Sequence, residues 1–465
     1  MLKLRLQVVV LVLLYSLSLA SCSDGPQPVM VKPPAREASY EPIAAGPLMD
    51  EQIAFELAVY YLPQPTKDPL AELDVLLKGK DAFFRRIEKI EKQVASPTLA
   101  ARLETDPKSV YAPPDLDSLQ YFGRGLSREQ AESLQQTESV LILDFSYSNL
   151  HVLDGLRTAL ELTHSLALAT GGLLWDEATR EVFSPETWEQ RRITDWTEQV
   201  PDLSKHTVIH AYNKGEYVRA ITLGMEKFGL PDVVADNFSW SLNRNVGHVV
   251  NLFAQAMVEG AVIKKPGEFD LDIRAIRNAK VREPQIATLK PNATGIALLS
   301  LRKGTWEEGD PSNRLIEITF DRGVGPDDHA RREQIVSAAF GWEDSATRIG
   351  HNDELQEASR QARTRLPALR AEFKEGLAPG EFILVKAPFE TPDGGHEWMW
   401  VEVASWKGDK ITGLLKKEPI NIPDLHGGQI VEVSEAQVFD YMWTHADGTT
   451  SGNETAKVIE ELSPK

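Results

Sequence analysis

The single cysteine of the chain, Cys22, sets the strongest limit on what the chain can fold into. One cysteine forms no disulfide within a chain, and it cannot supply the thiolate set of a structural zinc site or an iron–sulfur cluster. With 465 residues, the chain is long enough for two or three domains of ordinary size. We therefore expect apolar cores to hold these domains together, and the sequence predicts no metal site and no cofactor.

The charge balance limits the class of partner. The chain has 50 Lys and Arg residues against 69 Asp and Glu residues, a formal net charge of −19 at pH 7. An acidic surface repels phosphate, so the composition argues against a nucleic-acid-binding protein. Hydrophobic residues make up 42% of the chain and charged residues 26%. These values are typical of globular proteins and disfavour a disordered chain or a multispan membrane protein.

The amino terminus has the anatomy of a secretory signal. A basic start precedes an apolar stretch at 8–19 that is short for a membrane span. The run Leu19-Ala20-Ser21-Cys22 that follows resembles the lipobox of bacterial lipoproteins, a family in which the signal is cut before the cysteine and the cysteine is acylated. The resemblance implies a signal peptide at 1–21 and lipidation of Cys22. A plain secreted protein is the alternative.

The same resemblance implies a location. Ser23 follows the cysteine, where Asp would resemble an inner-membrane retention signal. The chain is therefore expected in the cell envelope, anchored by lipid to the outer membrane and facing the periplasm, since several acyl chains give stable anchoring. Residues 22–49 contain six prolines and few large apolar residues, which predicts a lipidated, extended tether.

The pattern of apolar and polar residues differs between successive segments of the chain. Residues 50–125 are expected to be a helical segment, with helices at 50–61, after Asp68-Pro69 and across 83–94. Residues 126–325 are expected to form a central α+β domain, because the apolar run at 139–148 reads as a strand and 153–169 as an amphipathic helix. The fold class predicted for the whole chain is multidomain α+β.

The last third predicts a different unit. A helix at about 354–373 is followed by short strands near 382–387, 397–405, 410–415 and 430–433, separated by glycine-rich turns such as His426-Gly-Gly428. This spacing predicts a small antiparallel β-barrel-like domain with a preceding helix at 353–443. Residues 448–465 are predicted to be a polar tail.

Four ordered motifs in this region carry a second resemblance. They lie at 382–389, 394–403, 411–419 and 428–443, and together they are similar to the bacterial family of unknown function numbered 2314, also called YegJ-like. Many members have a second histidine where this chain has Trp398, which weakens a metal or proton-transfer role for the neighbouring segment. The family has no established activity, so the resemblance implies a fold and little chemistry.

The glycine turn at 393–395 leads into the candidate site residues of this unit. Strand alternation puts an imidazole, a carboxylate and two stacking surfaces on one face, and glycines let a backbone approach a ligand. The possible binding residues are His396, Glu397, Trp398, Trp400 and Glu402. The alternative is structural: the tryptophans fill the core, and the polar side chains bond to the backbone.

Other motifs give weaker signals. His206 and His210 lie about 13 Å apart if they share a strand, which is too far for one metal ion. The carboxylates of Asp176, Glu177 and Glu181 flank a turn and could form an acid–base pair, although a solvated hairpin explains them more simply.

Two functional classes remain. The first is a non-enzymatic, membrane-anchored envelope protein that binds or scaffolds an unidentified envelope protein or ligand. The second is an envelope hydrolase that uses His396 with Glu397 or Glu402. The absence of a nucleophile elbow, P-loop or kinase motif favours the first class and leaves the catalytic residues unknown.

Overall fold

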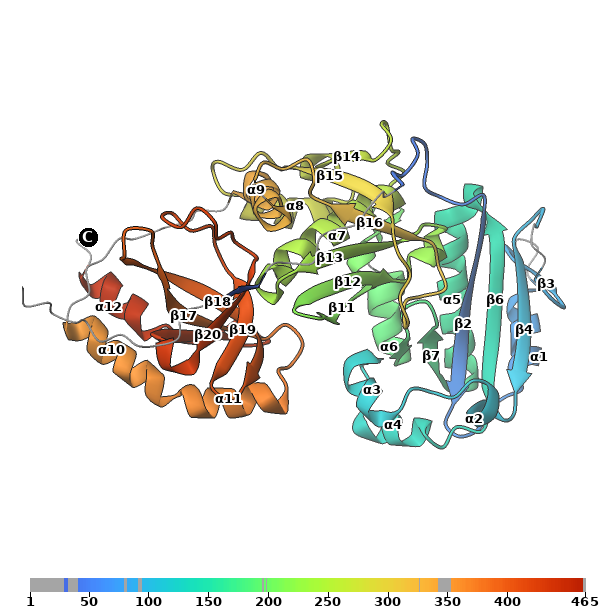
Figure 1. Ribbon diagram of the computed structural model, residues 1–465. Helices are drawn as coiled ribbons and strands as arrows, with labels where there is room; N and C mark the ends of the chain where they lie inside the picture. Colours follow the sequence, from blue (N-terminus) through green and yellow to red (C-terminus); the bar gives the residue numbers. More distant parts are fainter. Residues whose placement is uncertain are drawn as a thin grey trace, which may run out of the picture.

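The computed structural model describes residues 29–31, 41–78, 82–90, 94–194, 196–197, 199–325, 327–341 and 353–462. These residues form a multidomain α+β protein, as the sequence predicts, built on two seven-stranded sheets and one six-stranded sheet (Figure 1). The proposed signal peptide and Cys22 lie outside the described residues. None of the described helices is both long enough and apolar enough to cross a membrane.

The first sheet has the strand order β3-β4-β6-β2-β7-β8-β5. Its strands are β2 (Gln52–Tyr61), β3 (Arg85–Ile87), β4 (Thr98–Glu104), β5 (Gly123–Arg124), β6 (Val140–Ser148), β7 (Gly172–Asp176) and β8 (Glu181–Phe183). The long helix α5 (Val152–Thr170) packs on one face, together with α1 (Pro69–Leu76) and the short α6 (Pro185–Trp188). The helices α2 (Pro107–Val110), α3 (Leu116–Phe122) and α4 (Arg128–Leu134) lie around one end of the opposite face. We call these elements the first unit.

The helix predicted at 50–61 is wrong, because this segment is the strand β2. Ile53, Phe55, Leu57 and Val59 alternate along it and are buried on the α5 face. Ala58 and Tyr60 are buried on the opposite face, so the strand has apolar side chains on both sides. A strand buried on both faces reads as a nearly continuous apolar run, which obscures its period of two.

Two further expectations for 50–125 have different outcomes. The helix expected after Asp68-Pro69 is confirmed: α1 begins at Pro69, and the Asp68 carboxylate accepts hydrogen bonds from the backbone of Leu70 and Ala71. The helix expected across 83–94 is wrong where the structure describes it, because β3 pairs with β4 in a parallel register. Residues 91–93 lie outside the described residues.

The central sheet has the strand order β11-β12-β13-β16-β15-β14. Its strands are β11 (Val208–Lys214), β12 (Tyr217–Leu223), β13 (Asp232–Phe238), β14 (Glu268–Asp272), β15 (Ile296–Lys303) and β16 (Leu315–Thr319). The accompanying helices are α7 (Asn243–Val258), α8 (Ala279–Thr288) and α9 (Asp328–Phe340), and β9 (Trp196–Thr197) pairs with β10 (Val200–Pro201). This central unit shares one continuous apolar core with the α5 face of the first sheet.

The C-terminal sheet has the strand order β1-β20-β19-β18-β17-β21-β22 and is antiparallel throughout. Its strands are β1 (Val29–Val31), β17 (Phe382–Glu390), β18 (His396–Lys407), β19 (Lys410–Leu415), β20 (Ile430–Ser434), β21 (Asp440–Thr444) and β22 (Thr450–Gly452). Helices α10 (Asp353–Thr364), α11 (Leu366–Glu375) and α12 (Glu454–Leu462) complete this C-terminal unit. The sheet ends at β1 and β22, so its described strands form an open sheet rather than a closed barrel.

Both ends of the chain differ from the sequence prediction. Within 22–49, the segment expected to be an extended tether, β1 pairs with β20, and Gly46 pairs with Ile263 of the central unit. The polar tail expected at 448–465 instead contains β22 and α12. The buried Thr455 explains part of this difference, because its backbone N–H and hydroxyl both donate to the Asp440 carboxylate at 2.8 and 2.6 Å.

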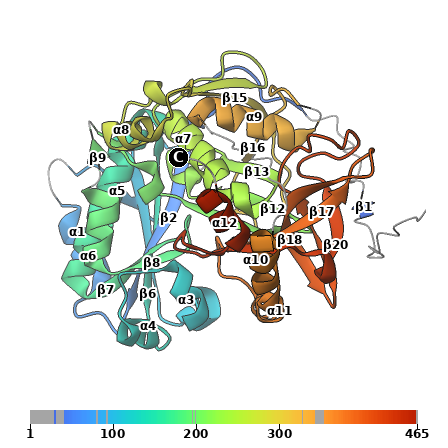
Figure 2. The ribbon, with the colours of Figure 1, turned by 90° about the vertical axis from the view of Figure 1, so that its left-hand side faces the viewer.

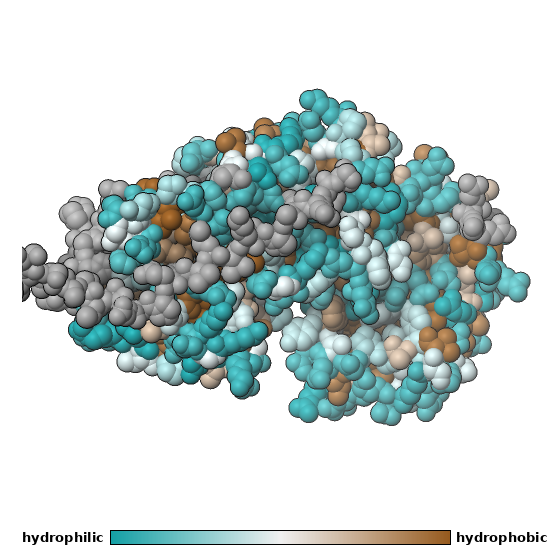
Figure 3. Space-filling view, in the orientation of Figure 1, coloured by the Kyte–Doolittle hydropathy of each residue, from teal (hydrophilic) through white to brown (hydrophobic). Residues whose placement is uncertain are grey.

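The central unit lies between the other two units in both ribbon views (Figures 1 and 2). The space-filling view shows a mainly hydrophilic face and an open notch between the C-terminal unit and the first unit (Figure 3). The hydrophilic face agrees with the acidic, charged composition of the chain.

Candidate functional site

The predicted glycine turn joins β17 to β18 and places His396 at its edge. The backbone N–H of Thr391 donates to the carbonyl of Gly395 at 2.9 Å, and Gly394 has a φ of +80°, a conformation that glycine adopts without strain. His396 is exposed and pairs with Glu390 in the register of the two strands. The turn predicted at 393–395 is therefore confirmed, and the imidazole next to it is accessible.

The neighbouring candidate residues contact other parts of the C-terminal unit. The Glu397 carboxylate accepts backbone hydrogen bonds from Ile420 at 2.8 Å and from Asn421 at 2.9 Å. The ring of Trp398 lies 4.4 Å from that of Phe439, measured between ring centroids. The Lys386 ammonium lies 5.6 Å from the centroid of Trp400, within cation–π range.

Glu402 has an unexpected partner in the central unit. Its side chain is 3% exposed and accepts hydrogen bonds from the backbone N–H groups of Trp240 and Ser241, just before α7. Glu402 lies six residues from His396 along β18, or about 20 Å at the rise of a strand. The structure therefore does not bring the Glu402 carboxylate and the imidazole into one site.

The carboxylates predicted around the β7–β8 turn are not all solvated. Asp176 and Glu181 are buried, and both pair with the fully buried Arg192 at 2.9 and 2.8 Å. Lys227 adds a second ion pair to Asp176. The solvated hairpin is therefore wrong for these two residues, because a buried arginine and lysine neutralise them.

A further candidate site, a cavity, lies on the first sheet, on the face opposite α5. It is a cavity of about 740 Å³ whose wall includes parts of β2, β4 and β6 and the segment just after β3. Five acidic side chains and two basic side chains line it: Glu56, Glu88, Asp144, Glu177, Glu226, Lys89 and Arg102. We call this cavity the Glu56 pocket.

Glu56 is held between a phenol and a guanidinium. The hydroxyl of Tyr111 donates a hydrogen bond to the Glu56 carboxylate. Arg102 lies 3.4 Å from Glu56, 2.8 Å from Asp144 and 3.7 Å from Glu104, so one cation pairs with three carboxylates. Burial raises the pKa of Glu56 to about 7, with a smaller contribution from Asp144.

Two further carboxylates of the pocket, Glu177 and Glu226, come from the segment after β7 and from the turn at 225–228. The indole N–H of Trp175 donates to Glu177 at 2.8 Å. Burial raises the pKa of both Glu177 and Glu226. When all lining groups are ionised, five negative charges face two positive charges in the Glu56 pocket. The pocket therefore has uncompensated, partly desolvated negative charge, which favours a cationic ligand.

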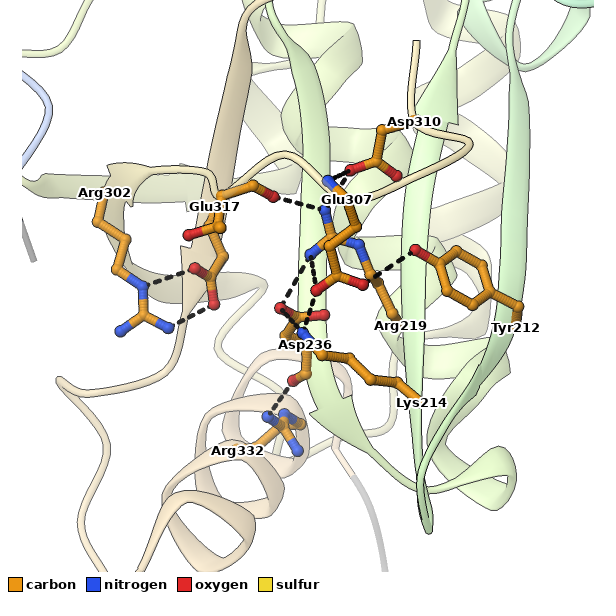
Figure 4. A network of polar contacts seen from close by, with 10 residues as sticks. Tyr212, Lys214, Arg219, Asp236, Arg302, Glu307, Asp310, Glu317 and Arg332 are labelled. Carbon is orange, nitrogen blue, oxygen red and sulfur yellow. Dashed lines mark hydrogen bonds and ion pairs between the residues drawn. The ribbon is translucent and has the colours of Figure 1, made fainter. Parts of the chain in front are cut away.

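The central unit contains a second charged cluster, shown in Figure 4. Buried Arg219 pairs with Asp236 at 2.9 Å and with Asp310 at 2.7 Å, which fastens the β15–β16 loop over β12 and β13. Arg302 and Glu317 form another buried pair. Four basic and four acidic side chains balance in this network: Lys214, Arg219, Arg302, Arg332, Asp236, Glu307, Asp310 and Glu317. Because its positive and negative charges balance, this cluster is best explained as a structural network.

The comparison with protein families gives a match in the C-terminal unit. Residues 352–465 match the family model described as "Uncharacterized protein conserved in bacteria (DUF2314)". The match confirms the similarity suggested by the four motifs and extends it through β22 and α12. The comparison with curated proteins and the comparison with solved structures found no match.

Sequence reasoning missed most of the Glu56 pocket. Glu177 was singled out, but Glu56, Arg102, Asp144 and Glu226 were not. Glu56 and Asp144 each interrupt an otherwise apolar strand, and they face one another in the register of β2 and β6. A lone acid inside an apolar strand was therefore the available signal, although its partners come from distant segments.

Proposed function

We propose that this chain is a lipid-anchored protein of the cell envelope whose body binds a small organic cation in the Glu56 pocket. The observation that carries the binding role is the excess of carboxylates in a cavity of about 740 Å³, where partial desolvation raises the pKa of Glu56, Glu177 and Glu226. A ligand ammonium or guanidinium group would restore the charge balance that folding leaves incomplete. A cavity of this size is within the range of small-molecule sites.

The lipid anchor rests on the sequence. The lipobox-like run ending in Cys22 supports lipidation of that cysteine and attachment to the outer membrane, with the body in the periplasm. A clickable fatty acid should label the wild-type chain, and Cys22→Ser should remove the label and release the protein from the membrane fraction. Label that persists in Cys22→Ser would contradict the anchor and leave the ligand proposal intact.

The hydrolase alternative has less support. Both carboxylates that it would pair with His396 accept two backbone hydrogen bonds, Glu397 from the segment after β19 and Glu402 from the central unit. These bonds fix the carboxylates in structural positions. The exposed His396 is more suitable for contact with a partner molecule, which keeps the envelope scaffolding role compatible with ligand binding.

A thermal-shift panel tests the ligand class. Putrescine, agmatine and benzylamine serve as cationic probes, and benzyl alcohol and succinate serve as neutral and anionic counterparts. At least one cation should raise the melting temperature of the purified chain, while the counterparts should not. Equal shifts with the neutral or anionic probes, or no shift with any cation at millimolar concentration, would contradict the proposed ligand class.

Matched variants locate the site. Glu226→Gln removes a pocket charge, whereas Glu432→Gln removes a charge that pairs with Lys410 on the C-terminal sheet. We expect the cation-induced shift to be lost in Glu226→Gln and retained in Glu432→Gln. If both variants keep the cation-induced shift, the cation binds outside the Glu56 pocket.

A further inference from the structure

Three metal-ligating side chains meet between the central unit and the C-terminal unit. They are Asp327, Glu418 and His426, and each offers a ligand atom within 4.8 Å of those of the other two. Asp327 precedes α9, while Glu418 and His426 belong to the loop between β19 and β20. The sequence had indicated only a glycine turn at 426–428.

Local contacts hold these donors in place. The Glu418 carboxylate lies 2.7 Å from Nδ1 of His426 and accepts a hydrogen bond from the backbone N–H of Gly427 at 3.0 Å. One oxygen of Asp327 accepts the backbone N–H of Ala330 at 2.8 Å, which caps α9. The donors therefore sit on a helix start and on a hydrogen-bonded loop.

The loop can approach α9 only because it contains glycine. Gly428 has a φ of +79°, and a Cβ at this position would lie 2.4 Å from the Cβ of His329, which follows Asp327 by two residues. A larger residue would therefore push the loop away from the start of α9. The close approach brings Glu418 and His426 to Asp327 across the boundary between the two units.

We propose that Asp327, Glu418 and His426 form a binding site for a divalent transition-metal ion, with Zn²⁺ as the best match. One imidazole and two carboxylates are a ligand set that Zn²⁺ accepts, with one position left for water. Tetrahedral ligand atoms around zinc lie roughly 3.3 Å apart. Donors that lie up to 4.8 Å apart would move together by about 1 Å, and the 2.7 Å contact between Glu418 and Nδ1 of His426 would lengthen, as both bind the ion.

The electrostatics support a cation at this position. Two carboxylates from separate elements lie here with their ligand oxygens within 4.8 Å of each other. A bound Zn²⁺ would connect α9 to the loop of the C-terminal unit. It would add to two existing contacts across this boundary: the Tyr217 hydroxyl donates to the Gly428 carbonyl at 3.3 Å, and Nε2 of His329 lies 3.3 Å from the Lys416 carbonyl oxygen. The ion should therefore stabilise the pairing of the two units.

Isothermal titration calorimetry of the purified, chelator-treated chain tests this site with ZnCl₂, and MgCl₂ serves as a hard-cation control. We expect one Zn²⁺ per chain, a higher melting temperature with Zn²⁺, and no such effect of Mg²⁺. His426→Ala should weaken Zn²⁺ binding at least tenfold. His164→Ala, on α5 in the first unit, is the matched histidine control and should bind like wild type.

A second variant separates metal binding from folding. Asp327→Asn keeps an oxygen that can cap α9 but removes the ligand charge, so the apo protein should melt near the wild-type temperature while Zn²⁺ affinity falls. No Zn²⁺ binding by the wild type would overturn the proposal. Wild-type affinity in both His426→Ala and Asp327→Asn would overturn it as well, because the ion would then be bound by other residues.

Discussion

Glu402 gives the sharpest test of how the C-terminal unit is attached to the central unit. Its buried carboxylate accepts hydrogen bonds from two backbone N–H groups before α7, and its charge has a larger effect on the pKa of Lys416 than that of Glu333. Lys416 in turn donates a hydrogen bond to the Ser241 hydroxyl at 2.5 Å. Glu402→Ala would leave two backbone donors without their acceptor and would remove a negative charge that acts on Lys416.

The expected cost follows from these contacts. A hydrogen bond to a charged group contributes about 1.5–3 kcal/mol, and breaking a buried charged contact by removing one partner costs about 3–5 kcal/mol. We therefore expect Glu402→Ala to lower the free energy of unfolding by about 3–5 kcal/mol. Glu402→Gln keeps one acceptor oxygen and should cost roughly half as much.

The matched control lies on the same sheet. Glu432 on β20 pairs with Lys410 at 2.7 Å, but the Lys410 side chain is 57% exposed, so Glu432→Ala should cost at most about 1 kcal/mol. Urea unfolding followed by tryptophan fluorescence, with calorimetry to separate the unfolding of the units, measures the difference. A cost for Glu402→Ala within about 0.5 kcal/mol of the control would refute the attachment role of Glu402.

Three further predictions concern the first and central units. Asp310→Ala removes one of three acidic partners of buried Arg219 and should destabilise the chain by about 3 kcal/mol in urea unfolding, whereas the exposed Glu308→Ala should change stability little. The raised pKa of Glu56 means that its protonated form favours the folded state, so its contribution to stability is present below about pH 4.5 and is lost as the pH rises through about 7. Glu56→Gln should remove that pH dependence in melting curves collected between pH 4.5 and 8, and an unchanged pH profile would show that another group causes it. Tyr111→Phe removes a hydrogen bond that lowers the pKa of Glu56, so the midpoint of the same profile should move to higher pH, and a midpoint that stays or falls would contradict this contact.

The sequence correctly predicted the helices and strands whose apolar pattern can be read within one continuous segment. The apolar run at 139–148 became β6, and the amphipathic stretch at 153–169 became α5, because each buries its apolar side chains in the way its period indicates. The strand β2 was mistaken for a helix because its alternating residues Ile53, Phe55 and Leu57 lead into a continuous buried run at 57–61, where both faces are covered. Burial on both faces is a property of the assembled sheet and leaves only a weak trace in the sequence.

The candidate sites depended on contacts that sequence spacing cannot show. Periodicity placed Trp400 and Glu402 on one face of a strand correctly, but it could not show that the central unit uses Glu402 as a hydrogen-bond acceptor. The Glu56 pocket joins side chains from β2, β4 and β6 and from the segments after β3 and β7, and only the folded sheet brings them together. The anchor at Cys22 remains a prediction from the amino-terminal pattern alone.

Direct titration of a cation at two pH values tests the central claim, that the Glu56 pocket binds an organic cation. The strongest probe from the thermal-shift panel is titrated calorimetrically into the wild type and Glu56→Gln at pH 6 and pH 8. Because the pKa of Glu56 is about 7, we expect wild-type binding to be several-fold tighter at pH 8, while Glu56→Gln binds at least tenfold more weakly at pH 8 and loses the pH dependence. Equal affinity of the two proteins at both pH values would contradict the claim.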